Sequence, residues 1–89
     1  MKKRIIIFGS TGSIGESTLD IISDHLDLYE VIGLTINCNY KKLHEQVKKF
    51  NPKVVSIHNS DAYQDFLRIN TDQNLKVLNG NDSLVDILE

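Results

Sequence analysis

Near its N-terminus the chain carries a turn in which glycines recur at every third position. Residues 9–15 read GSTGSIG, which places glycines at 9, 12 and 15. We expect Gly9 to let the chain turn sharply and Gly12 to let the backbone approach a pyrophosphate without a Cβ in the way. Gly15 would let the following helix pack closely against the sheet. The N-terminus of that helix would then present free N–H groups and a positive dipole end to an anion.

The residues between these glycines add to the same interpretation. Ser10, Thr11 and Ser13 are expected to supply hydroxyl donors on the phosphate side, and Ile14 to be the first apolar anchor of the helix. A tight turn without a ligand would not explain three glycines and three hydroxyls in seven residues. We therefore interpret the segment as a phosphate-binding turn that follows a strand and opens a helix.

A P-loop is the obvious rival interpretation of a glycine-rich turn. That motif requires G-x-x-x-x-G-K-[ST]. Here Glu16 occupies the place of the lysine, and the glycine spacing also differs. A carboxylate at this point would repel a triphosphate, so we exclude the P-loop.

Short apolar runs alternate along the chain with segments of helical periodicity. The expected strands are residues 4–8, 31–36, 54–57 and 75–78, and the expected helices are residues 13–25, 40–50, 60–69 and a last one from Asp82 or Ser83 to Leu88. In the first helix Ile14, Leu19, Ile22 and Leu26 should share the buried face, and Ser60 or Asp61 should cap the third.

This alternation predicts an α/β fold of the Rossmann-like, doubly wound, parallel class. The pattern contains about four strands, whereas a complete dinucleotide-binding domain normally has two more. We therefore expect residues 1–89 to be one Rossmann domain, or part of one, within a larger protein.

Composition narrows the class of protein. The 89 residues are 40% hydrophobic and 25% charged, with a net charge of −2, which is ordinary for one small globular domain. A nucleic-acid partner is not expected, because there is no basic excess. No apolar run reaches the length of a signal h-region or a membrane span, and the single cysteine, Cys38, allows no internal disulfide. We expect a cytoplasmic protein without a membrane partner.

The end of the second strand bears on which dinucleotide would bind. NAD-specific folds place an acid there to accept a hydrogen bond from the ribose 2′-OH. Here residues 35–42 read TINCNYKK and contain no acid, while Glu30 lies at the other end of the strand. This favours NADP, with Lys41 or Lys42 as a source of charge for the 2′-phosphate. Both lysines fit equally well on a solvated helix face.

The turn and the helix after it resemble one enzyme family. The run from Gly9 to Gly15, continued by STLDII at residues 17–22, is similar to the N-terminus of 1-deoxy-D-xylulose 5-phosphate reductoisomerase. The resemblance continues after the second strand, in Asn39, Leu43, residues 45–47 (EQV), Phe50 and residues 52–53 (PK). It covers most of residues 4–58.

The resemblance implies an NADPH-binding segment of an enzyme that rearranges and reduces 1-deoxy-D-xylulose 5-phosphate to 2-C-methyl-D-erythritol 4-phosphate. It implies a Mg or Mn ion, a sugar phosphate substrate, a homodimer and a role in non-mevalonate isoprenoid synthesis. The implied cofactor contacts are Gly9, Thr11, Gly12, Ser13, Ile14 and Gly15 in the turn, and Asn37, Cys38 and Asn39 after the second strand. The family often has a small residue at the position of Asn37 and lysine or serine at that of Cys38, so the contact to the 2′-phosphate departs from the pattern.

No catalytic residue and no metal ligand is expected within these 89 residues. The resemblance places the metal-binding acids, the substrate-phosphate residues and the lid beyond position 89, so the segment alone should be inactive. Two alternatives stay open. One is a non-catalytic nucleotide-sensing Rossmann module, and the other is a different NADP-dependent reductase with an analogous turn.

Overall fold

The computed structural model describes residues 2–80, and in this range strands and helices alternate without exception. The elements are β1 (Lys3–Phe8), α1 (Ser13–Ser23), β2 (Tyr29–Ile36), α2 (Tyr40–Phe50), β3 (Val54–Ile57), α3 (Ser60–Ile69) and β4 (Lys76–Asn79). The expected α/β alternation is confirmed, and every element in this range begins and ends within two residues of its expected bounds. The helix expected near residues 82–88 lies outside the described residues.

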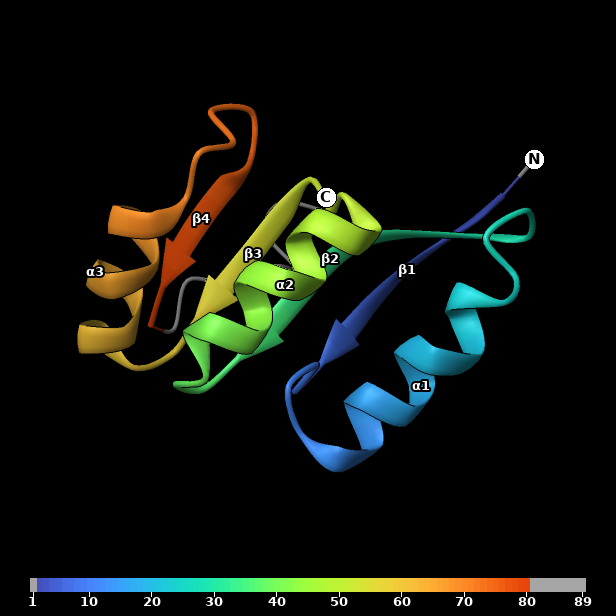
Figure 1. The fold of residues 1–89 in the computed structure, drawn as a ribbon, viewed down its shortest axis with the longest axis horizontal. Helices are drawn as coiled ribbons and strands as arrows, with labels where there is room; N and C mark the ends of the chain where they lie inside the picture. The colour runs from blue at the N-terminus through green and yellow to red at the C-terminus, as the bar shows by residue number, and fades with distance from the viewer. Residues whose placement is uncertain (1, 81–89) are drawn as a thin grey trace.

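The four strands form a single parallel sheet in the order β1-β2-β3-β4. Each crossover therefore moves one strand further in the same direction. In Figure 1 the helices run alongside the strands in chain order, with α2 in front of β2 and β3 and between α1 and α3. Right-handed crossovers that all advance in one direction place their helices on one face of a sheet. In residues 2–80 the helices of this Rossmann-like fold therefore cover one face of the sheet.

The core lies between the sheet and this helical layer. Leu34 of β2, Val55 and Ile57 of β3, Leu43 of α2 and Phe66 of α3 have no exposed side-chain surface. Leu34 pairs with Val55 in the β2–β3 register, so apolar side chains at matching heights form continuous rows under the helices. This packing fixes the height of each helix, and thus where its N-terminus emerges beyond the strands.

The buried face of α1 differs from the expected one. Gly15, Leu19 and Ile22 are buried, whereas Ile14 is 84% exposed and Leu26 is 40% exposed. The prediction that Ile14 anchors the helix is therefore wrong. The spacing 15, 19, 22 is itself helical, and Ile14 lies one residue, about 100°, away from that stripe. Leu26 lies beyond the end of the helix at Ser23, in the turn that leads to β2.

The cap of α3 also differs from the sequence prediction. The N-cap is Asn59, whose Oδ1 accepts a hydrogen bond from the Ala62 N–H at 2.9 Å. Ser60 is already the first residue of the helix, so neither Ser60 nor Asp61 caps it. Asparagine is as good an N-cap as serine or aspartate, and three such residues in a row leave the choice to tertiary structure.

Within residues 2–80 no helix has the length and apolar character that crossing a membrane requires.

Candidate functional site

The glycine turn lies at the carboxyl edge of the sheet, against the end of β2. The Gly9 N–H donates to Thr35 Oγ1 at 3.1 Å, and the Ser10 N–H donates to the Thr35 carbonyl at 2.9 Å. Because the strands are parallel, the residues that follow β2 emerge at this same edge. The structure therefore brings together the two segments that the sequence singled out, the turn and Asn37–Asn39. Ligands of open α/β sheets bind at this edge.

The structure requires glycine at two of the three glycine positions of the turn, for two different reasons. Gly9 has φ +68°, a left-handed conformation that side chains disfavour. At Gly15 an added Cβ would lie 2.2 Å from the Gly9 carbonyl oxygen, so only glycine lets α1 approach the turn. At Gly12 the nearest atom to an added Cβ would be 3.4 Å away, an ordinary contact, and φ is −82°. Packing within the described residues therefore does not require a glycine at position 12.

The N-terminus of α1 faces the edge with free donors. Gly12 is the N-cap and contributes no side chain, while the Glu16 N–H donates to the Gly12 carbonyl at 2.8 Å. Within residues 2–80 no hydrogen-bond acceptor is found for the N–H groups of Thr11, Ser13 and Ile14. The N–H groups of Ser13 and Ile14 are unsatisfied donors of the helix start and lie at the positive end of its dipole, and the N–H of Thr11 lies just before the N-cap.

Ser10 corrects one expectation about the turn. Its side chain is fully buried, and its Oγ donates to Gln46 Oε1 of α2 at 2.8 Å. The same Gln46 donates through Nε2 to the Ser10 carbonyl at 2.7 Å. Ser10 therefore points into the protein and contributes no donor on the phosphate side. Of the expected hydroxyls, Ser13 is exposed and Thr11 half-buried.

The segment after β2 is open to solvent. Asn37, Cys38 and Asn39 are all exposed, and Cys38 is a free thiol. Asn39 is the N-cap of α2, because its Oδ1 accepts from the Lys42 N–H at 3.3 Å. This role occupies the oxygen of its amide and leaves the NH₂ group to donate. The Asn37 side chain can donate and accept, so the segment offers neutral polar groups.

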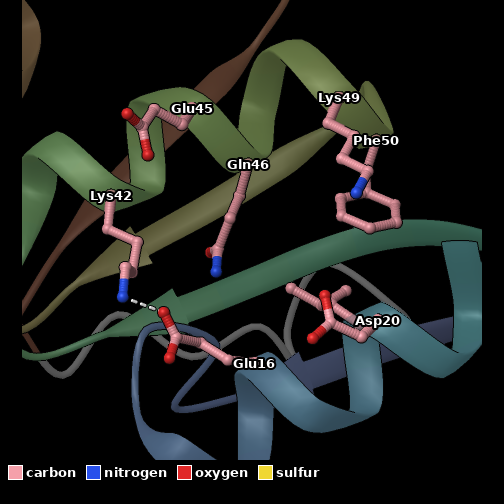
Figure 2. A pocket seen from close by; sticks show the side chains of 8 residues that line it. Glu16, Asp20, Lys42, Glu45, Gln46, Lys49 and Phe50 are labelled. Atoms are coloured by element: carbon pink, nitrogen blue, oxygen red, sulfur yellow. Dashed lines mark ion pairs between the residues drawn. The ribbon is translucent and has the colours of Figure 1, made fainter.

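Lys41 and Lys42, which were expected to supply charge for the 2′-phosphate, have different surroundings in the structure. Lys42 forms an ion pair with Glu16 of α1, whereas Lys41 is exposed. The pair bridges the first turns of α1 and α2, and it is half exposed (Figure 2). Glu16 thus lies beside α2, at the rim of the turn, where its charge is balanced.

A groove of about 310 Å³ lies between α1 and α2, and both residues of this ion pair line it. Figure 2 shows acidic side chains of α1 and acidic and basic side chains of α2 around it. Its lining residues are Glu16, Leu19, Asp20, Lys42, Glu45, Gln46, Lys49 and Phe50. Three carboxylates, Glu16, Asp20 and Glu45, and two lysines, Lys42 and Lys49, line the groove. Within the described residues no group of three or more His, Cys, Asp or Glu side chains could hold a metal ion.

Gln46 and Glu16 are the two site-shaping residues whose contacts the sequence reasoning missed. A signal for Gln46 was present, because it falls between Leu43 and Val47 on the apolar stripe of α2. A polar residue in a buried stripe needs a partner, but the periodicity does not say which one.

Comparison with known proteins identifies the fold and the family. The family model described as 1-deoxy-D-xylulose 5-phosphate reductoisomerase matches residues 5–89. The reductoisomerase of Phocaeicola vulgatus is 46% identical over 89 residues, which is 100% of this chain and 23% of that protein. The enzyme of Thermoanaerobacter sp. is 41% identical over 87 residues, 98% of this chain and 22% of that protein.

Solved structures agree. The reductoisomerase from Zymomonas mobilis in complex with NADPH superposes with a TM-score of 0.86 at 37% identity, over 97% of this chain and 23% of that one. A reductoisomerase structure with fosmidomycin and magnesium gives a TM-score of 0.83 at 33% identity, over 96% and 21% of the two chains. The chain therefore spans less than a quarter of the length of the relatives it matches. Over that length, the chain belongs to the 1-deoxy-D-xylulose 5-phosphate reductoisomerase family.

Proposed function

We propose that this chain is the NADPH-binding segment of an enzyme that rearranges and reduces 1-deoxy-D-xylulose 5-phosphate to 2-C-methyl-D-erythritol 4-phosphate. The observation that carries the proposal is the turn from Gly9 to Gly15, with its unpartnered N–H groups, in a fold that superposes on a reductoisomerase–NADPH complex with a TM-score of 0.86. The family match also argues against a different NADP-dependent reductase.

The turn fits the pyrophosphate of the cofactor. The N–H groups of Thr11, Ser13 and Ile14 would donate to its oxygens, as helix starts do for phosphates. Packing within the protein leaves room for a side chain at Gly12. The close approach of a ligand therefore explains why this position has no side chain. Gly9 and Gly15 shape the turn. Gly9 adopts the left-handed conformation, and Gly15 allows α1 to lie close to the turn.

The segment after β2 would contact the adenosine end of the cofactor. Rossmann domains place the ribose 2′ position there, and an acid at this point selects NAD. The only acid of β2, Glu30, pairs in register with Arg4 at the opposite end of the sheet and cannot fill that role. Asn37, Cys38 and Asn39 leave the position neutral, and Lys41 and Lys42 lie in the first turn of α2 to supply positive charge.

When bound, NADPH supplies the hydride for the reduction. Residues of this chain would anchor and orient the cofactor. The turn would bind its pyrophosphate, and the segment after β2 would bind its adenosine end. We assign the Mg or Mn ion, the sugar phosphate and the homodimer contacts to the rest of the enzyme, beyond this segment. A related reductoisomerase structure contains fosmidomycin and magnesium, which supports a divalent metal in the whole enzyme. The single free cysteine is consistent with our inference of a cytoplasmic enzyme.

The test is a fluorescence titration of the full-length protein with NADPH and with NADH, followed by turnover with 1-deoxy-D-xylulose 5-phosphate and Mg²⁺ or Mn²⁺. We expect NADPH to bind at least about tenfold more tightly than NADH, a difference of about 1.4 kcal/mol. Equal affinity for the two, or no binding by folded protein, would refute the assignment. Binding without turnover would favour the nucleotide-sensing alternative.

A further inference from the structure

The turn is held by a side chain that lies 36 residues further along the chain. Gln46 makes two hydrogen bonds to Ser10, accepting from its Oγ at 2.8 Å and donating to its carbonyl at 2.7 Å. Both residues are buried, with exposed fractions of 0% for Ser10 and 9% for Gln46. In Figure 2 Gln46 extends from α2 into the space between the two helices, next to the Glu16–Lys42 ion pair.

The chemistry of this pair allows only one arrangement. The Ser10 carbonyl can only accept, so the NH₂ group of the amide must face it, and the amide oxygen then faces the Ser10 hydroxyl. Ser10 also donates its N–H to the Thr35 carbonyl at 2.9 Å. All of its polar groups are thus engaged, two by Gln46 and one by β2. This makes Ser10 the fixed point of the glycine turn.

The contact couples two parts of the cofactor site. Gln46 stands on α2, the helix that Asn39 caps and that follows directly from the β2 end. Ser10 stands in the turn whose backbone packs against Gly15 of α1. The two hydrogen bonds therefore set the distance and orientation between the pyrophosphate turn and the adenosine segment. Among residues 2–80, the other hydrogen bonds between the turn and β2 run to Thr35, and the Glu16–Lys42 ion pair joins the first turns of α1 and α2.

We propose that Gln46 is a positioning residue for NADPH, which acts through Ser10 to hold the pyrophosphate turn in register with the β2 end. The inference rests on the proposed function and extends it to a residue that does not touch the cofactor. Because NADPH spans both parts, its affinity depends on their relative placement. A ligand that occupies only the adenosine segment does not depend on it.

Two variants of the full-length enzyme test the inference. Gln46→Glu keeps the size of the side chain and the acceptor for Ser10 Oγ, but it sets an oxygen against the Ser10 carbonyl. Ser10→Ala removes one of the two bonds and leaves the core volume almost unchanged. Gln64→Glu is the matched control, because Gln64 is an exposed glutamine of α3 whose side chain makes no hydrogen bond within the described residues.

We expect Gln46→Glu to raise the KM for NADPH about tenfold, equivalent to about 1.4 kcal/mol. The kcat of Gln46→Glu at saturating NADPH and its KM for the sugar phosphate should stay within about twofold of the wild type. Ser10→Ala should raise the KM for NADPH about threefold, as expected when one buried hydrogen bond is lost. Adenosine 2′-monophosphate, measured by competition, should bind all variants within about twofold of the wild type.

Three outcomes would overturn the inference. One is wild-type affinity for NADPH in both Gln46→Glu and Ser10→Ala, and another is an equal loss for NADPH and adenosine 2′-monophosphate, which would show a general loss of structure. The third is a loss in Gln64→Glu as large as in Gln46→Glu. If Gln46→Glu does not fold, Ser10→Ala decides by the same criteria. Failure of the wild type to bind NADPH would instead refute the proposed function.

Discussion

A methyl group at position 15 should harm both the stability of the fold and the binding of NADPH. In Gly15→Ala the new Cβ would lie 2.2 Å from the Gly9 carbonyl oxygen, 2.7 Å from Ser10 Cα and 2.9 Å from the Gly9 carbonyl carbon. All three are backbone atoms, so no side-chain rotation relieves the contact. Ordinary contact begins at 3.4 Å, so α1 and the turn would have to separate by roughly 1 Å.

Two opposing effects decide the sign of the stability change. Alanine in place of glycine inside a helix is worth about 1 kcal/mol in favour of the variant. Overpacking of this kind costs about 1–3 kcal/mol, and here the neighbours cannot yield. We expect Gly15→Ala to lower the free energy of unfolding by about 1–2 kcal/mol. The displaced start of α1 should weaken NADPH binding at least about tenfold, because a shift near 1 Å misaligns its N–H donors.

The variant Gly12→Ala separates the effect of a side chain on ligand binding from its effect on packing. Its Cβ would meet nothing closer than 3.4 Å, and the backbone there is not left-handed. The free energy of unfolding should therefore stay within about 0.5 kcal/mol of the wild type, as for ordinary surface changes. NADPH affinity should still fall at least about tenfold, because the methyl group occupies the space where the pyrophosphate approaches.

The assays are urea unfolding and NADPH titration of the full-length protein and both variants. A Gly15→Ala protein as stable as the wild type would refute the packing argument. A Gly12→Ala protein that binds NADPH normally would show that the turn is not the pyrophosphate site.

Further substitutions test the cap, the charge at the 2′-phosphate and the core. Asn59→Ala should destabilise the protein by about 1 kcal/mol in urea unfolding, whereas Ser60→Ala should change it by less than about 0.5 kcal/mol; the reverse order would return the cap to Ser60. Replacing Lys41 and Lys42 together by alanine should lower the affinity for NADPH about tenfold more than the affinity for NADH in titrations, and an equal effect on the two cofactors would remove their role. Phe66→Ala should cost about 3–5 kcal/mol in urea unfolding, because the ring is fully buried; a loss below about 1 kcal/mol would contradict its place in the core.

The sequence was a good guide to the elements because each of them carries a local signal. The apolar run of Val54–Ile57 and the Asn51–Pro52 stop after α2 were enough to place β3 and the end of that helix. The order of the strands carried no such signal. Whether β4 pairs with β3 or with β1 depends on long-range packing, and in the structure it pairs with β3.

The site divides in the same way. The conformation of Gly9 and the close packing at Gly15 follow from residue type and position, and the structure bears out both. The direction of Ser10 could not be predicted from the turn itself. A serine between two glycines can point to either side, and here a buried amide of α2 decides it. The face of α1 was missed for a related reason, since glycine does not count as apolar in a periodicity search although Gly15 lies on the buried stripe.

The choice between NADPH and NADH must be made at the end of β2 and not in the turn. The turn offers backbone N–H groups to a pyrophosphate that the two cofactors share, so no change there can discriminate between them. At the β2 end the described residues lack the acid that would hold a 2′-OH, and the position of Cys38 offers no cation either. The positive charge for a 2′-phosphate then falls to Lys41 and Lys42. Lys42 forms an ion pair with Glu16, so selectivity for NADPH over NADH should depend more on Lys41. Lys41→Ala alone should therefore account for most of the loss of NADPH affinity in the double variant.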